Sequence, residues 1–278
     1  MMIATCLSYL CRIPSIKRFL MRRLTSSFPQ NPWTAVKGEV SNVRPDCEKT
    51  TSVIPFQLDV GFTEKLMAKC KFEGVTLHAA FQVATMAAMS DFLGSSPNTQ
   101  WTAMTTIDMR RLFPDQLTAQ HVVQCLGGVE VTHRLPLEWK ENFWQCAREV
   151  GQTLRCNMHA AVLQNMKTSE IAVKCNISLE DFVKCSQNGS RNHCYMSINN
   201  MGNCNFLNRH DQNVVHLKAR FGGSSEHEFG PTMASSVTTL QQRINWSLLY
   251  FKNVTTKEEA KNVAQGIREA LHLASAHL

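Results

Sequence analysis

The sequence has no two cysteines at CxxC spacing, no glycine-rich phosphate loop and no apolar run long enough to cross a membrane. The missing loop argues against Rossmann and P-loop nucleotide-binding folds. The 11 cysteines are odd in number and occur in apolar segments, where a free thiol behaves as a small hydrophobic side chain. Zinc and disulfide frameworks need tighter, paired spacing. We therefore expect no metal site and a reducing, cytoplasmic compartment.

Most of the net charge of +7 comes from one end of the chain. Residues 1–38 hold six of the 29 basic residues and no acidic residue, which leaves the rest of the chain at +1. A nucleic-acid-binding face needs clustered cations, so we expect no nucleic-acid partner. The basic segment is interpreted as an exposed linker helix. A mitochondrial presequence is the alternative, whereas a secretory signal is disfavoured because no positive region precedes apolar residues 3–11.

Hydrophobic periodicity divides the chain into two parts. Residues 1–52 are predicted to be a basic N-terminal segment and a linker, the latter rich in Ser, Thr, Asn and Pro. Residues 53–278 are predicted to form the folded domain. No membrane span is expected, because the uncharged stretch 74–90 contains polar residues and is shorter than a bilayer requires.

Strand-like and helix-like patterns are mixed along the folded part without strict βαβ alternation. Thr63 and Thr76 are the expected helix caps of the first two helices, and Thr256 with Glu259 forms a capping box for the last. The helix at 77–93 is apolar on both sides and is expected to be buried nearly all round. Strands are predicted at 54–62, 100–111, 125–135, 193–201 and 214–220, with a pair within 233–251, and helices at 63–71, 77–93, 141–164 and 178–185 and after Thr256. The pattern favours an α/β sandwich with a mixed sheet.

Four segments, in this order, resemble the C-terminal half of the coenzyme-A-dependent acyltransferase superfamily, which includes condensation domains and alcohol acetyltransferases. They are the run KFEGVTLHAA at 71–80, the strand ending IDMR at 107–110, the segment MSINNMG at 196–202, and a closing hairpin through 246–251 followed by a helix. The resemblance covers residues 54–273, with the alcohol acetyltransferase branch most similar. It implies one half of a chloramphenicol-acetyltransferase-like fold.

The catalytic feature of that superfamily is missing from this sequence. Its enzymes remove the acceptor's proton with the second His of an HHxxxDG motif in the N-terminal half, and this sequence has no His-His pair. We expect residues 14–49 to correspond to the linker between the halves. The resemblance therefore implies a truncated or inactive acyltransferase-family protein, with no catalytic residue assigned.

Two pairs of residues are candidates for substrate binding. Asp108 and Arg110 are predicted to share a strand face, either as a buried ion pair that links strands or as lining of a substrate tunnel. Ser197 and Asn199 also share a predicted strand face, beside a turn at Gly202. A turn-forming role and a substrate or coenzyme contact are both open for this second pair.

Three functional hypotheses follow. The first is an acyltransferase-family protein with no permanently bound cofactor, for which an acyl-CoA and an alcohol or amine are the implied substrates and a missing N-terminal half the implied partner. The second is a non-catalytic interaction module whose exposed apolar face binds another protein. The third is an acyltransferase that uses another base, with His159 or His193 as candidates, while His78 on the buried helix is interpreted as structural.

Overall fold

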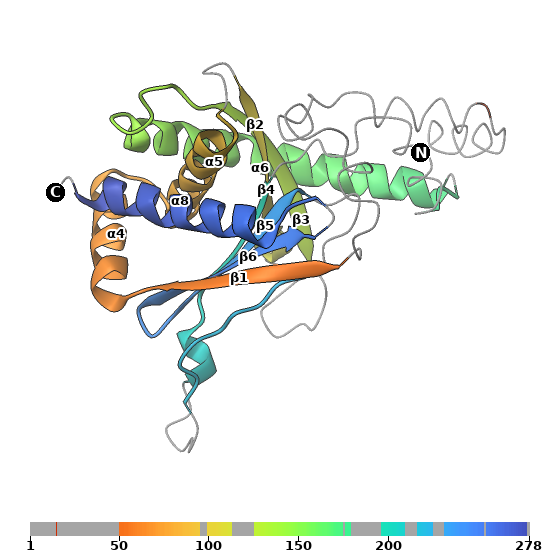
Figure 1. Ribbon diagram of the computed structural model, residues 1–278. Coiled ribbons are helices and arrows are strands. Elements are labelled where there is room, and N and C mark those ends of the chain that lie inside the picture. The colour runs from red at the N-terminus through yellow and green to blue at the C-terminus, as the bar shows by residue number, and fades with distance from the viewer. Residues whose placement is uncertain are drawn as a thin grey trace.

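The computed structural model describes residue 15 and residues 50–94, 99–112, 125–174, 176–178, 196–208, 216–224, 231–252 and 254–276. Its elements lie in a two-layer α/β sandwich (Figure 1). The strands are β1 (Thr51–Leu58), β2 (Gln100–Asp108), β3 (Leu126–Arg134), β4 (Met196–Asn203), β5 (Met233–Leu240) and β6 (Arg243–Phe251). The helices are α4 (Val60–Phe72), α5 (Leu77–Leu93), α6 (Phe143–Lys174) and α8 (Lys257–Ala276), with short 3-10 helices η2 (Met109–Leu112) and η3 (Asn205–Asn208).

The six strands form one mixed sheet in the order β1-β6-β5-β4-β2-β3. Strand β4 runs parallel to both β2 and β5, and the pairs β1–β6, β5–β6 and β2–β3 are antiparallel. The predicted mixed-sheet sandwich is therefore confirmed. Because β2, β4 and β5 run in the same direction, their carboxyl ends lie at one edge of the sheet.

Helix α5 is the centre of the helical layer. The described structure buries every residue from Ala79 to Met89, which confirms the prediction of a helix buried nearly all round. Thr76 caps the helix as expected, since its hydroxyl accepts a hydrogen bond from Ala79 N at 3.2 Å. Small side chains on α5 allow α8 and α6 to pack closely on either side of it.

Hydrogen bonds and ion pairs join the helices to one another. The Trp144 indole of α6 donates to the carbonyl of Ala274 in α8 at 3.1 Å. Glu73, just after α4, pairs with Lys69 at 3.0 Å and with Arg148 of α6 at 2.7 Å. The Lys69 hydrogen bond, followed by that of Arg148, lowers the pKa of Glu73.

The capping box of the last helix is present as predicted. Thr256 Oγ1 accepts from Glu259 N at 3.1 Å, and the Glu259 carboxylate accepts from Thr256 N at 2.8 Å. The predicted pair of strands within 233–251 is also confirmed as β5 and β6. Gln241 and Gln242 form the two-residue turn between them, each with positive φ.

Helix α4 and strand β1 begin earlier in the chain than predicted. The helix cap is Asp59, whose carboxylate accepts from Phe62 N at 2.8 Å, and Thr63 lies inside the helix. The Thr63 hydroxyl bonds back to the Leu58 carbonyl at 3.5 Å, as Ser and Thr do within the first turn. The predicted strand 54–62 is therefore β1 at Thr51–Leu58, followed directly by the helix.

A second error concerns the predicted strand 214–220. Residues 216–224 are described and contain no strand, and residues 214 and 215 lie outside the described residues. Backbone groups of this segment form hydrogen bonds with side chains. The Asn208 side chain donates to the Leu217 carbonyl and accepts from the Leu217 N–H, both at 2.9 Å. Thr238 Oγ1 donates to the Arg220 carbonyl at 2.8 Å. We call residues 216–224 the covering segment. The predicted helix 178–185 lies outside the described residues except for Ser178.

Candidate functional site

The sheet has one face covered by helices and a second face made largely of small polar side chains. Strands β4, β5 and β6 alternate, so that Met196, Ile198 and Trp246 point toward the helices and their neighbours toward the other side. We call this second side the polar face. It carries Thr102 and Thr106 of β2, Glu130 of β3, Ser197 and Asn199 of β4, Ser236 and Thr238 of β5, and Asn245 and Ser247 of β6. Burial raises the pKa of the Glu130 carboxyl. Hydroxyl and amide groups in such a row can bind polar parts of a substrate.

The structure places Ser197 and Asn199 on the polar face, which is the shared face that the sequence predicted. Their neighbours on β5 are Ala234 and Ser236, respectively, and Ser197 lies opposite Met104 of β2. Ser197 is half-buried and Asn199 is exposed. Whether either residue contacts a substrate stays a prediction.

Asp108 and Arg110 do not share a strand face as predicted, because β2 ends at Asp108 and Arg110 lies in η2. The Asp108 carboxylate accepts from the Arg110 backbone N–H at 3.0 Å and from its guanidinium at 3.2 Å. A short Asp side chain that captures the backbone N–H two residues later ends a strand locally. The pair is partly exposed and joins neighbouring residues, so it is not a buried ion pair between strands.

The histidines that the structure describes do not contribute to the polar face of the strands. Across the six described strands the one histidine is His133, which lies opposite the core residue Trp101 and so faces the helices. Burial lowers its pKa, an effect that Glu149 partly opposes. His159 is exposed on α6, and His193 lies outside the described residues.

His78 belongs to a hydrogen-bonded group between α5 and β2. Its Nε2 lies 2.9 Å from Thr105 Oγ1, and the Gln82 amide donates to the same hydroxyl at 2.6 Å. While it accepts from Gln82, the Thr105 hydroxyl can donate its own hydrogen to an unprotonated His78 Nε2. Burial lowers the pKa of His78 to about 4, in agreement with this arrangement. This supports the interpretation of His78 as structural.

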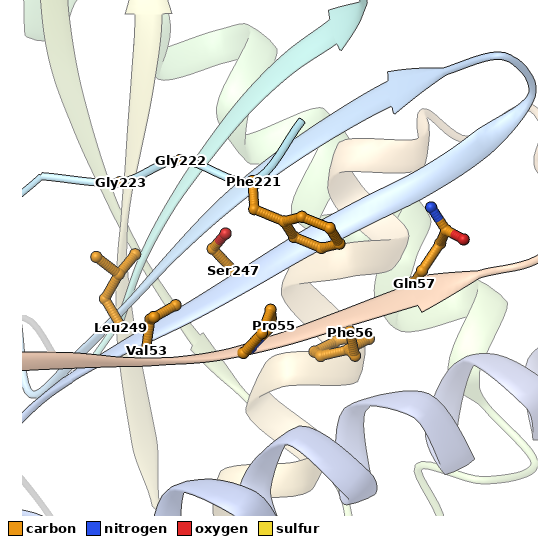
Figure 2. A pocket seen from close by; sticks show the side chains of 9 residues that line it. All are labelled: Val53, Pro55, Phe56, Gln57, Phe221, Gly222, Gly223, Ser247 and Leu249. Carbon is orange, nitrogen blue, oxygen red and sulfur yellow. The ribbon is translucent and has the colours of Figure 1, made fainter. Parts of the chain in front are cut away.

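A cavity of about 580 Å³ lies on the polar face where β1 and β6 meet the covering segment (Figure 2). Val53 and Pro55 of β1 and Leu249 of β6 form one wall, and Phe221 with the backbone of Gly222 and Gly223 lies across from them. None of its nine lining residues is charged. The volume falls within the range of small-molecule sites.

Ser247 is the polar group of this cavity for which we find no partner. It is 1 % exposed, and its hydroxyl has no hydrogen-bond partner in the described part of the chain. Nearby polar side chains are satisfied: Gln57 donates to Asn245 at 2.6 Å, and Asn245 donates to the Arg243 carbonyl at 3.3 Å. Sequence reasoning missed Ser247. The alternation of β6 could have identified it. Trp246 and Leu248 face the core, so Ser247 between them must face the opposite side of the sheet.

The described residues offer neither a metal-binding cluster nor a membrane-spanning helix. They contain no group of His, Cys, Asp and Glu side chains arranged to hold a metal ion. None of the described helices is long and apolar enough to span a bilayer.

Comparison with solved structures identifies the fold. The epimerization domain of tyrocidine synthetase B matches with a TM-score of 0.58 at 14 % identity, over 99 % of this chain and 57 % of that one. A trichothecene 15-O-acetyltransferase from Fusarium sporotrichioides matches with a TM-score of 0.61 at 15 % identity, over 85 % of this chain and 50 % of that one. A condensation domain of the enacyloxin polyketide synthase matches with a TM-score of 0.56 at 11 % identity, over 95 % of this chain and 48 % of that one.

These likenesses show that the chain has the condensation-domain and acyltransferase type of fold, which confirms the fold expected from the resemblance. The chain spans about half the length of these three solved chains. The sequence matches no family model, and no curated protein matches it.

Proposed function

We propose that this chain is a substrate-binding half of an acyl-transfer fold, which holds an acyl-CoA thioester and an alcohol or amine on its polar face and does not transfer the acyl group unaided. One observation carries the proposal: the polar face of the six described strands offers hydroxyl and amide groups, with the Glu130 carboxylate on the edge strand β3, but no histidine. Hydroxyls and amides can hold carbonyl and amide groups by hydrogen bonds. Near neutral pH they do not act as general bases on an alcohol or amine.

The fold comparison supports this proposal, because the similar proteins include an O-acetyltransferase and condensation domains, and the chain covers about half of each. In the family that the sequence resembles, the base belongs to the other half. We infer that a further polypeptide segment, in this protein or in a partner, supplies the base to the polar face. Asn199 and Ser197 are the residues we assign to substrate contact, since they occupy the centre of the sheet on that face.

Two measurements on the purified chain test the proposal. Calorimetric titration with acetyl-CoA is expected to show binding, weakened about tenfold by Asn199→Ala and unchanged by Asn157→Ala, an exposed change on α6. Incubation with acetyl-CoA and a series of alcohols and amines is expected to yield no acetylated product by mass spectrometry. Mass spectrometry suits a chain with 11 cysteines better than a thiol reagent does.

Either of two results would contradict the proposal. Product formation by the purified chain, lost on His159→Ala or His193→Ala, would establish an enzyme with a different base. Failure of acetyl-CoA to bind, or equal binding by the Asn199→Ala variant, would remove the assigned role of the polar face.

A non-catalytic interaction module is the second candidate function, and exposed apolar side chains favour it. Met201, Phe206, Leu207, Leu217 and Phe221 are each 39–54 % exposed, and all follow the centre of β4. Contiguous exposed apolar residues often mark protein interfaces. Under this alternative, Phe206→Asp abolishes capture of a protein partner without changing acetyl-CoA binding.

A further inference from the structure

We propose that the cavity between β1, β6 and the covering segment binds an uncharged, largely apolar small molecule that carries one hydroxyl or carbonyl group, and that Ser247 recognises this group. The inference does not depend on acyl transfer. The cavity lies at the β1–β6 side of the sheet, with β5 separating β6 from Ser197 and Asn199 on β4.

The first argument is the buried hydroxyl of Ser247. A buried hydroxyl without a hydrogen bond destabilises the folded state, and such groups in native proteins generally have a partner. Ser247 is 1 % exposed and unpartnered among the described residues, although it lies on a face where Gln57, Asn245 and Thr238 all have partners. Figure 2 shows its oxygen directed into the cavity, toward the side occupied by Phe221. A ligand hydroxyl or carbonyl there would complete its hydrogen bonding.

The second argument is the composition of the walls. Val53 and Leu249 present aliphatic side chains, Pro55 presents its ring, and Phe221 presents an aromatic ring opposite them. A charged ligand would lose hydration here without gaining an opposite charge, since no lining residue is ionisable. An apolar ligand would bury its surface against these walls at a gain of about 25 cal/mol per Å². The site therefore selects neutral, apolar molecules.

The third argument is that the covering segment is held in place independently of any ligand. Thr238 Oγ1 donates to the Arg220 carbonyl at 2.8 Å, and the Asn208 side chain holds Leu217 through two hydrogen bonds of 2.9 Å. Gly223 approaches Leu249 so closely that an added Cβ would clash with the Leu249 side chain. These contacts hold the covering segment in position across the cavity without a ligand, as expected for a largely pre-formed site.

The test uses three fluorescent probes of one shape: 2-naphthol with a hydroxyl, naphthalene without a polar group, and 2-naphthoate with a charge. The full chain is expected to bind 2-naphthol with a dissociation constant on the order of 0.1 mM, estimated from its heavy-atom count. Naphthalene is expected to bind more weakly by about threefold to tenfold, the ratio that one net hydrogen bond provides. Binding of 2-naphthoate is expected to be weaker than that of both.

Two variants locate the binding site. Ser247→Ala is expected to abolish the preference for 2-naphthol over naphthalene while leaving naphthalene binding intact. Val53→Trp fills the cavity from its β1 wall and is expected to abolish binding of both probes. Its matched control is Met67→Trp on α4, because Met67 and Val53 are exposed to almost the same extent, 46 % and 45 %.

Stability of the ligand-free variant provides an independent readout. If Ser247 is retained for a ligand, Ser247→Ala removes an unsatisfied buried hydroxyl and is expected to unfold at a higher urea concentration than the original chain. A Ser247 that served only the fold would unfold at a lower concentration when changed to Ala. The inference is overturned by that lower midpoint, by an unchanged naphthol preference in Ser247→Ala, or by equal binding to the Val53→Trp and Met67→Trp variants. These outcomes are separate from acetyl-CoA binding, which tests the proposed function.

Discussion

At the scale of single residues, desolvation favours the neutral form of His78, which lies beside the Thr105 hydroxyl. Thr105 accepts from the Gln82 amide at 2.6 Å and is 2.9 Å from His78 Nε2. A protonated His78 could still donate to Thr105, because a hydroxyl oxygen has two lone pairs, but its positive charge would be poorly hydrated there. The folded state consequently favours neutral His78, and its pKa of about 4 expresses that preference.

We predict that His78 makes folding stability pH-dependent between about pH 6.5 and pH 4. In this range the unfolded chain binds a proton at His78 and the folded chain does not, so the free energy of unfolding falls as pH falls. The loss reaches about 3 kcal/mol near pH 4 and stops there, because both states are then protonated. Urea unfolding at intervals from pH 7.5 to 4 measures the effect.

His78→Gln is the control for this prediction. Glutamine does not titrate, and its side-chain oxygen can still accept from Thr105. The difference in unfolding free energy between the original chain and the variant is therefore expected to change over this range, which separates His78 from the carboxylates that titrate in both proteins. Parallel pH profiles for the two proteins would show that His78 is protonated as easily in the folded chain as in the unfolded one.

Residue-level predictions succeeded where a repeat pattern carried them and failed where a side chain bonded locally. The alternation of β4 placed Ser197 and Asn199 on one face correctly. The same reasoning failed for Arg110, because Asp108 captures its backbone N–H and ends β2. Ser247 was missed for another reason. Its cavity depends on the covering segment, more than twenty residues earlier in the chain, and no local pattern shows that approach.

At the scale of elements, the hairpin between β5 and β6 has an unusual turn. Leu240 pairs with Arg243, so Gln241 and Gln242 alone make the connection, with φ values of 49° and 60°. Two successive positive φ values are typical of a type I′ turn, for which Asn-Gly is preferred. Non-glycine residues in this conformation are strained, at roughly 1 kcal/mol each.

We predict that replacing this turn by Asn-Gly, through Gln241→Asn and Gln242→Gly, stabilises the chain by about 1 kcal/mol. The backbone N–H of Gln241, which donates to Asn205 at 2.7 Å, is retained in the variant. The midpoint of urea unfolding measures the gain. Gln265→Gly on the exposed side of α8 is the matched control and is expected to lose about 1 kcal/mol, since glycine weakens a helix interior. Equal losses from both Gln→Gly changes would show that the turn is not strained.

The turn shows how much of an element the sequence can predict. The length of the stretch 233–251 predicted two strands with a turn near Gln241–Arg243, although glutamine is not a turn-forming residue. Strand pairing forces the chain to reverse there, and the sheet outweighs the local preference. The covering segment is the opposite case: residues 214–220 alternate as a strand does, yet the described part forms none because side chains of Asn208 and Thr238 bind its backbone.

At the scale of the whole molecule, the helical layer depends on close contacts made by small residues. Helix α5 packs against α8 on one side and α6 on the other. At Gly266 of α8, an added Cβ would lie 3.0 Å from Ala88 Cβ and 3.3 Å from the Ala88 backbone. At Gly151 of α6, an added Cβ would lie 3.6 Å from Ala79 Cβ, which is an ordinary contact.

We predict opposite effects for the same substitution at these two glycines. Gly151→Ala is expected to raise the free energy of unfolding by up to about 1 kcal/mol, because alanine favours the helix and has room. Gly266→Ala is expected to lower it by about 1 kcal/mol or more, because α8 must move away from a backbone that cannot yield.

The double variant Ala88→Gly, Gly266→Ala relieves the closest contact, so a double-mutant cycle should show a favourable coupling between the two sites. Equal stabilisation by Gly151→Ala and Gly266→Ala would mean that α8 does not pack on α5 at this distance. Gly266 lies in the helical layer and Asn199 lies on the polar face. At temperatures where both variants are folded, Gly266→Ala is therefore expected to weaken acetyl-CoA binding less than Asn199→Ala does.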